Sequence, residues 1–197
     1  MLNLISRKMT RLLLDRSKNV KYGEEVYIYG CELIISTVLC FTGVMLTSLL
    51  FSELPSGIVF IIVFSSLRAY AGGYHADTYG RCFMIINSVY LGVLMLKEFF
   101  WEEIPLIVYY VTFFVSIYYI ASNAPMINEN QPIDENKQNN CKRNIKCVLF
   151  VDVLLIVLLT FINKELMCMT VFTICLVMIF MMISHKKIMI NERGAKA

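Results

Sequence analysis

Six runs of hydrophobic residues, divided by short polar stretches, occupy most of the chain between residues 32 and 184. A helix needs about 20 apolar residues to cross the hydrocarbon layer of a membrane, with a usual range of about 17–25. Four of the runs have that length. The second and the fifth are marginal, and the second is either a short span or a tilted or re-entrant element. The runs cover residues 32–52, 54–67, 83–100, 104–124, 147–162 and 166–184.

The pattern before the first run mixes apolar and basic positions. It has neither the continuous apolar core nor the small-residue cleavage site of a signal peptide. It predicts instead a basic amphipathic helix that suits the surface of an anionic membrane. The apolar positions are Leu4, Met9, Leu12 and Leu13, and the basic positions are Arg7, Lys8, Arg11 and Arg16.

A polar, asparagine-rich stretch at residues 125–146 separates the first four hydrophobic runs from the last two. Pro125 and Pro132 disfavour a helix in it, so we expect a loop. We therefore predict a single-domain, all-α, polytopic integral membrane protein with about six membrane segments. Its parts are an N-terminal amphipathic segment (1–31), a half that carries the candidate chemistry (32–124), the loop (125–146), the C-terminal membrane segments (147–184) and a basic tail (185–197).

The composition agrees with a membrane protein. Of the 197 residues, 58% are hydrophobic and 17% are charged, whereas soluble domains are nearer half apolar and about a quarter charged. The seven cysteines are irregularly spaced and form no CxxC pair, which argues against a disulfide framework and against a zinc site. We expect no metal, no other cofactor and no nucleic-acid partner.

The distribution of lysine and arginine predicts the orientation in the membrane. With six spans and a cytoplasmic N-terminus, 16 of the 18 basic residues face the cytoplasm, and only Lys97 and Lys164 lie outside. Such an excess of basic residues is typical of cytoplasmic loops. Both termini, the 125–146 stretch and the segment between the second and third runs are therefore expected at the cytoplasmic face.

That last segment, RAYAGGYHADTYGRC at residues 68–82, carries the candidate chemistry. A cysteine attacks as its thiolate, and a neighbouring histidine can take the proton and later return it to a leaving amine. His75 and Cys82 are the candidate pair. On one uninterrupted helix they would lie about 10.5 Å apart along the axis, so the backbone must turn between them. Asp77-Thr78 and Gly80 offer such a break, and Gly72-Gly73 permits irregular backbone before His75.

Other charged residues are candidates for supporting roles. Arg68 and Arg81 are suited to bind the carboxylates of an acidic peptide, although both also fit as flanking charges of membrane segments. Glu32 begins the first hydrophobic run, where an acid is costly, and we rank it first as a third catalytic group that orients His75 or pairs with Arg68. Asp77 and Asp152 are the other acids considered for this role.

The arrangement of these residues resembles the signature of the AgrB family, the accessory gene regulator B peptidases of Gram-positive quorum-sensing systems. The matching elements are Arg68, Gly72-Gly73, His75-Ala76 and Cys82, together with YGCE at residues 29–32. The layout is also similar over nearly the whole chain, with a basic amphipathic N-terminus and about six apolar segments.

The resemblance implies a cysteine endopeptidase of the bacterial cell membrane, a homodimer whose substrate is an AgrD-like propeptide. By this analogy Cys82 attacks the scissile carbonyl with help from His75, and the C-terminal tail of the propeptide leaves. An internal cysteine or serine of the substrate then attacks the acyl-enzyme thioester and closes the thiolactone or lactone ring of the autoinducing peptide, which is still joined to its leader.

Two other classes of function also fit the composition. One is a small transporter or peptide-export protein without peptidase activity, although no internal repeat typical of many transporters is visible. The other is a non-enzymatic assembly or receptor subunit.

Overall fold

The computed structural model describes residues 2–16, 23–72, 78–126 and 135–194. These residues form seven helices and no strand, which confirms the predicted all-α class. The helices are α1 (Leu2–Arg16), α2 (Glu24–Leu50), α3 (Leu54–Ala71), α4 (Tyr79–Phe100), α5 (Leu106–Asn123), α6 (Glu135–Ile162) and α7 (Lys164–Gly194).

Six of the helices, α2 to α7, are long and apolar enough to cross a membrane. The number of predicted membrane segments is therefore confirmed. The second run, which was marginal by length, is a continuous helix of 18 residues because the stretch from Arg68 to Ala71 prolongs α3 beyond the purely apolar part.

The expectation of a loop over the whole of residues 125–146 is wrong for its second half. α6 begins at Glu135, so residues 135–146 of the expected loop are helical, and α7 continues through much of the expected basic tail to Gly194. Pro132 precedes α6 in the sequence, and the polar residues from Glu135 to Lys146 include good helix formers but neither proline nor glycine. Hydropathy marks where the chain leaves apolar surroundings, whereas a helix ends where its backbone hydrogen bonds end.

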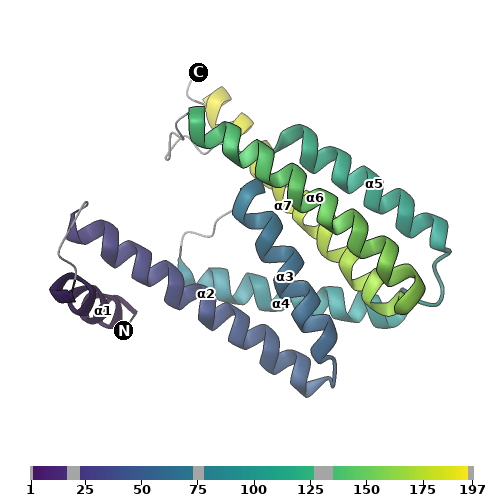
Figure 1. The fold of residues 1–197 in the computed structure, drawn as a ribbon, viewed down its shortest axis with the longest axis horizontal. Helices are drawn as coiled ribbons and strands as arrows, with labels where there is room; N and C mark the ends of the chain where they lie inside the picture. Colours follow the sequence, from purple (N-terminus) through teal and green to yellow (C-terminus); the bar gives the residue numbers. More distant parts are fainter. Residues whose placement is uncertain (1, 17–22, 73–77, 127–134, 195–197) are drawn as a thin grey trace.

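The bundle is organised around α3 (Figure 1). This helix packs against α2 on one side and against α6 and α7 on the other, while α4 runs beside α2 and α5 lies along α7. Aromatic rings fill the centre: Phe60 stacks on Phe64 with ring centroids 5.2 Å apart and lies 5.0 Å from Tyr90 of α4. The same ring of Phe64 meets Phe180 of α7 at 6.3 Å, so one aromatic chain connects three helices.

Small residues let α2 approach its neighbours closely, as is common where membrane helices meet. Gly43 of α2 faces Asn87 of α4, and Gly57 of α3 faces Ser48 of α2. The Ser48 hydroxyl also hydrogen-bonds the Tyr90 hydroxyl at 2.6 Å. These contacts fix the register of α2 and α4, which run in the same direction.

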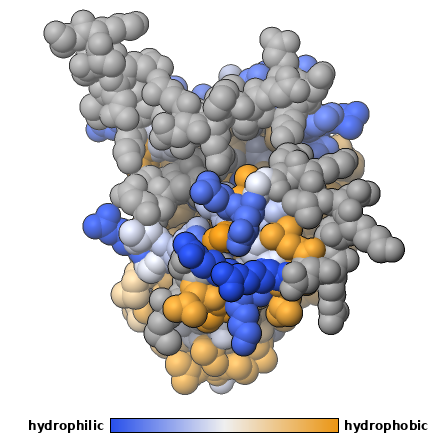
Figure 2. All heavy atoms as spheres, turned by 90° about the vertical axis from the view of Figure 1, so that its left-hand side faces the viewer, coloured by the Kyte–Doolittle hydropathy of each residue, from blue (hydrophilic) through white to orange (hydrophobic). Residues whose placement is uncertain are grey.

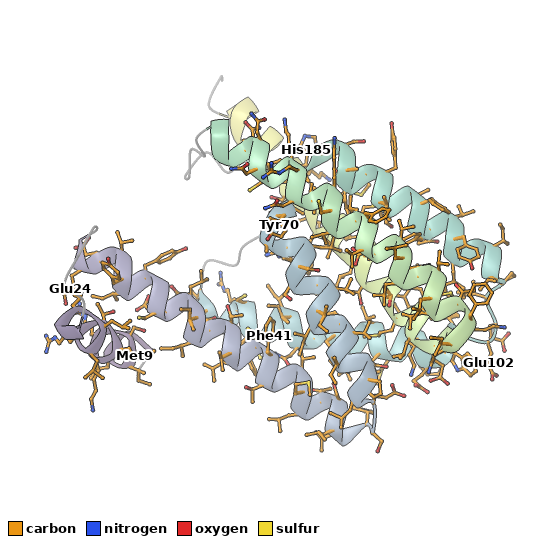
Figure 3. All side chains as sticks on the ribbon, viewed as in Figure 1. Met9, Glu24, Phe41, Tyr70, Glu102 and His185 are labelled. Carbon is orange, nitrogen blue, oxygen red and sulfur yellow. The ribbon has the colours of Figure 1, made fainter. Side chains whose placement is uncertain are left out.

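The outer surface of the bundle carries many large apolar side chains, which project from the helices in Figure 3. Phe161 is 86% exposed, and Ile62 and Phe114 are each 60% exposed. Seen from the end that carries α1, hydrophilic residues gather in the middle of the surface and hydrophobic residues at its lower edge (Figure 2). Such extensive apolar exposure is expected of a surface that lipid covers.

The predicted amphipathic helix is α1, which packs beside the start of α2. Its buried face consists of small polar residues: Ser6 and Thr10 are fully buried, and the Thr10 hydroxyl contacts the Cys31 sulfur of α2 at 3.5 Å. Leu4 and Leu12 point outward, with 77% and 57% of their surface exposed. The apolar face of α1 is thus available to the membrane interface, as the sequence pattern predicts.

A charged cluster lies at the opposite end of α4 from Cys82. Lys97 is fully buried, and its ammonium nitrogen lies 2.8 Å from a carboxylate oxygen of Glu53, 2.9 Å from one of Glu98 and 3.7 Å from one of Glu165. The cluster ties the end of α4 to the α2–α3 connection and to the first turn of α7. A buried ammonium is tolerated because three carboxylates surround it.

Candidate active site at the start of α4

The end of α3 has a backbone conformation that favours glycine. Gly72 caps the helix with φ +73°, and its N–H donates to the carbonyl of Arg68 at 3.3 Å. A Cβ atom at this position would lie 3.0 Å from the carbonyl oxygen of Met126. The N–H of Met126 donates to the carbonyl of Ala71 at 2.9 Å, so the segment after α5 is held against the end of α3.

The start of α4 supplies the break that the candidate dyad requires. Thr78 has extended backbone, and its hydroxyl accepts a hydrogen bond from the N–H of Arg81 at 3.3 Å, a typical N-cap. An uninterrupted helix from His75 to Cys82 is therefore excluded. The break falls at Thr78, as predicted, whereas Gly80 lies within the first helical turn.

Three of the candidate residues lie outside the described part of the chain. They are Gly73, His75 and Asp77. The pairing of His75 with Cys82 thus stays a prediction from the sequence, and the geometry of the site is built from the residues that flank this segment.

Cys82 is half-buried in the first turns of α4, where its N–H donates to the carbonyl of Thr78 at 3.0 Å. The positive charge of Arg68, in the last turn of α3, acts electrostatically on its thiol. The guanidinium of Arg68 is itself held between two rings, 5.8 Å from the centroid of Phe64 and 5.8 Å from that of Phe180. A permanent positive charge in a fixed position therefore lies beside the candidate nucleophile.

The structure adds one residue that the sequence pattern does not point to. Cys40 of α2 is 2% exposed and lies across the α2–α4 interface from Cys82. In the sequence, Cys40 stands in a hydrophobic run, where a cysteine is usually a small buried hydrophobe. Only the packing of α2 against α4 brings it near Cys82.

Glu32 lies next to the same end of α4. Its carboxylate accepts a hydrogen bond from the Tyr79 hydroxyl at 3.2 Å, which joins α2 to the first residue of α4. Arg81 is exposed, one residue before Cys82. Asp152, by contrast, is buried in α6. This helix packs on α3, α5 and α7, whereas Cys82 lies on α4, so the described structure does not support Asp152 as a partner of Cys82.

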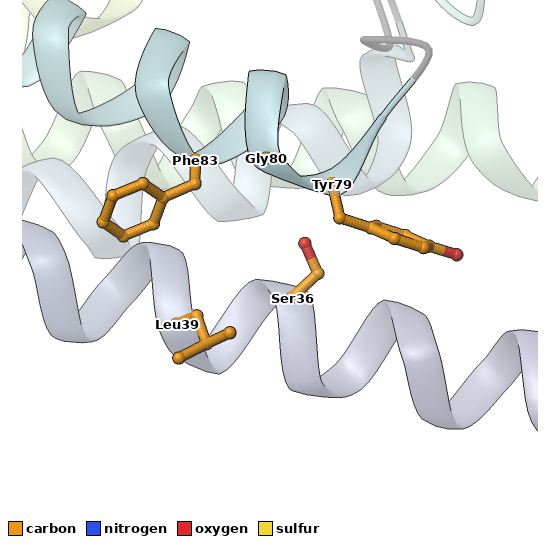
Figure 4. Close-up of a pocket in the computed structure, with 5 residues that line it drawn as sticks. All are labelled: Ser36, Leu39, Tyr79, Gly80 and Phe83. Carbon is orange, nitrogen blue, oxygen red and sulfur yellow. The ribbon is translucent and has the colours of Figure 1, made fainter. Parts of the chain in front are cut away.

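A pocket of about 300 Å³ opens between α2 and α4 beside this site (Figure 4). It is almost entirely apolar, and the Ser36 hydroxyl points from α2 toward α4 within it. Cys82 lies in the same helical turn as two of the lining residues. The residues that line the pocket are Ser36, Leu39, Tyr79, Gly80 and Phe83.

These features define a class: a polytopic helical membrane protein with a thiol, a guanidinium and an apolar pocket gathered where α2, α3 and α4 meet. Residues 3–184 match the sequence model of the family described as accessory gene regulator B. The chain belongs to the AgrB family, and hence to the accessory gene regulator system.

Three relatives agree with this assignment. Over 145 residues, 68% of each chain, the protein is 29% identical to a "Putative AgrB-like protein" of Clostridium perfringens strain SM101. It is 28% identical, over the same length and shares, to "Putative AgrB-like protein 2" of Clostridium perfringens strain 13. A Clostridium beijerinckii relative is 29% identical over 105 residues, 53% of this chain and 52% of its own. No solved structure matches the chain.

Proposed function

We propose that this protein is a membrane-embedded cysteine endopeptidase that removes the C-terminal tail of a small AgrD-like propeptide and promotes its cyclisation. The observation that carries the proposal is the position of Cys82, half-buried beside Arg68 and next to an apolar pocket. Family membership supports the same interpretation, and the sequence resemblance implies that Cys82 corresponds to the family's cysteine.

The surroundings of Cys82 suit a thiolate. Arg68 supplies a full positive charge, and the N-terminal end of α4 adds the partial positive charge of its backbone N–H groups. Both stabilise negative charge on the sulfur, and the rings of Phe64 and Phe180 keep the guanidinium in place. His75, seven residues earlier, is the proposed base that removes the thiol proton.

The proposed reaction has two steps. In the first, the Cys82 sulfur attacks the scissile carbonyl carbon, the C–N bond breaks, and the protonated His75 gives its proton to the leaving amine, which leaves a thioester on Cys82. In the second, a cysteine thiol or serine hydroxyl within the substrate attacks the thioester carbonyl. Cys82 is released and a thiolactone or lactone closes. A site sheltered from bulk water favours this attack over hydrolysis.

The remaining residues have proposed supporting roles. The exposed guanidinium of Arg81 is suited to bind carboxylates of an acidic tail. Glu32 and Tyr79 hold the first turn of α4 against α2, and Gly72 ends α3 with a positive φ ahead of the segment that carries Gly73 and His75. The charge distribution supports a site and both termini at the cytoplasmic face. We also propose that the working form is a homodimer.

One observation favours the alternative of a transporter or export protein. Asp152 is 3% exposed within a candidate membrane span, and its Oδ2 atom has no hydrogen-bond partner among the described residues. Intramembrane acids often lie on transport pathways. Proteoliposomes that move ions or peptide without cleaving it would support this alternative.

Cleavage by purified membranes tests the peptidase proposal. The substrate is a tagged propeptide from the reading frame immediately downstream of the gene. Cys82→Ala and His75→Ala should each abolish release of the C-terminal tail, and the wild-type intermediate should be cleaved by hydroxylamine, which attacks thioesters. The matched control is Cys31→Ala, which removes a buried thiol that contacts Thr10 of α1. Near-normal tail release by Cys82→Ala would overturn the proposal.

A further inference from the structure

We propose that Cys40 and Cys82 form a reversible disulfide that blocks the nucleophile, so that oxidants of the peroxide class switch the protein off. The loss of activity rests on the proposed function, whereas formation of the bond does not.

The two thiols lie on facing helices. Both cysteines are free, and the contacts of Glu32 with Tyr79 and of Gly43 with Asn87 place Cys40 and Cys82 across the same stretch of the α2–α4 interface. A disulfide needs Cα atoms that are usually about 4.4–6.8 Å apart, a separation that closely packed helices can provide.

The packing of α2 against α4 explains why the pair is aligned. Glu32 contacts Tyr79 at one level of the interface, and Gly43 faces Asn87 at another. Cys40 lies between the two α2 positions, and Cys82 lies between the two α4 positions. Because the helices run in the same direction, the cysteines occupy matching levels, and the close approach at Gly43 keeps the helices together there.

The two thiols differ in access, which gives the reaction an order. Cys82 is half-buried beside the pocket, so a small oxidant can reach it, whereas Cys40 is 2% exposed. Hydrogen peroxide oxidises the Cys82 thiol to a sulfenic acid and releases one water. The Cys40 sulfur then attacks the sulfenic sulfur, forms the S–S bond and releases a second water. The two thiols lose two electrons and peroxide gains them. A dithiol reverses the bond by exchange.

The other described cysteines have neighbours other than Cys82. The Cys31 sulfur contacts the Thr10 hydroxyl, and the Cys168 thiol donates to the Tyr109 hydroxyl at 3.4 Å. Cys141 and Cys147 lie on α6, a helix that packs on α3, α5 and α7, and Cys175 of α7 lies beside Ser116 of α5. Cys40 is therefore the resolving thiol that the structure assigns to Cys82.

The test maps the bond in the full-length protein. Membranes are treated with hydrogen peroxide, free thiols are blocked with N-ethylmaleimide, and the digested protein is analysed by mass spectrometry without reduction. We expect a linked peptide pair that contains Cys40 and Cys82 in the wild type and in Cys31→Ala, and its absence in Cys40→Ala and Cys40→Ser. The serine variant keeps nearly the same shape and serves if the alanine variant does not fold.

Activity gives the second readout. Peroxide should lower tail release by the wild type about tenfold or more, and dithiothreitol should restore it. In the Cys40 variants, prolonged peroxide should cause a loss that dithiothreitol does not reverse, because the unresolved sulfenic acid proceeds to sulfinic acid. Cys82 found linked to another cysteine, or oxidised to sulfinic acid in the wild type while Cys40 stays free, would overturn the inference. A linked peptide in a protein that never cleaves the propeptide would instead overturn the proposed function alone.

Discussion

The guanidinium of Arg68, at the end of α3, interacts electrostatically with the thiol of Cys82, in the first turns of α4. The sequence places both residues in one short segment and suggests that Arg68 binds carboxylates of the substrate. The structure gives Arg68 a more direct relation to the chemistry, because its charge acts on the sulfur and its guanidinium lies 5.8 Å from the ring centroids of both Phe64 and Phe180.

Replacing Arg68 should therefore slow the reaction of Cys82 itself. We expect Arg68→Gln to reduce both tail release and alkylation of Cys82 by iodoacetamide by about tenfold or more, because the charge that stabilises the thiolate is lost. Arg68→Lys should be intermediate, since it keeps the charge but not the planar stacking. Arg143→Gln, which removes an exposed charge on α6, is the control. Unchanged alkylation in Arg68→Gln would show that the guanidinium does not act on the thiol.

Gly72→Ala should destabilise the protein, whereas Gly80→Ala should not. At Gly72 the backbone has φ +73°, and the new methyl group would lie 3.0 Å from the Met126 carbonyl oxygen. We therefore expect the free energy of unfolding to fall by about 1–3 kcal/mol. Gly80 is in the first turn of α4 with open space around it, and alanine there should be neutral or stabilising by less than about 1 kcal/mol. Thermal unfolding in detergent, monitored by fluorescence-detection size-exclusion chromatography, compares the two variants with the wild type.

The protein should become less stable as the pH is lowered, because the Glu53 carboxylate becomes protonated. Burial raises the pKa of its carboxyl, but the hydrogen bonds from Lys97 and Ser56 and the charge of Lys97 outweigh that effect, so the pKa lies below its ordinary value. A carboxyl whose pKa is lower in the folded than in the unfolded protein stabilises the fold above the unfolded pKa, and this contribution is lost as pH falls through the folded pKa.

The measurement compares the melting temperature of the wild type with that of Glu53→Gln. The wild type should be more stable at pH 7, and the difference should shrink below about pH 4, where carboxyls begin to protonate. Glu102→Gln, an exposed acid near the same end of the bundle, should show no such pH dependence. A difference that stays constant down to pH 3 would contradict the assignment.

Glu32 and Tyr79 share a hydrogen bond, and their variants separate a structural role from a role in the chemistry. Tyr79→Phe removes only the hydroxyl and should lower tail release by less than about threefold. Glu32→Gln should lower it by about tenfold or more, if the carboxylate also orients His75. Equal effects of the two substitutions, measured as kcat/KM, would mean that Glu32 acts only by holding the start of α4.

The orientation in the membrane can be tested with a native thiol. Cys141 lies near the start of α6, in a stretch that the charge distribution predicts at the cytoplasmic face. In a variant that keeps only this cysteine, a membrane-impermeant maleimide should label inverted vesicles and not intact cells. Labelling of intact cells would reverse the proposed topology.

The sequence by itself determined the class of the protein and the identity of the candidate residues. Apolar runs of sufficient length, divided by polar stretches, require helices that bury their backbone hydrogen bonds in a membrane, so six segments and an all-α fold follow from hydropathy. It did not determine where α6 begins or where α7 ends, because a helix can continue into polar surroundings.

Only the tertiary structure decided which residues of different helices meet. The glycines of the α2 interface set how closely and in what register α2 and α4 pack, and that register brings Cys40 to Cys82 and Glu32 to Tyr79. The packing of the bundle likewise brings the charge of Arg68, at the end of α3, to act on the thiol. Contacts between distant segments depend on the packing of whole helix faces, and residue type and spacing along one segment do not contain that information.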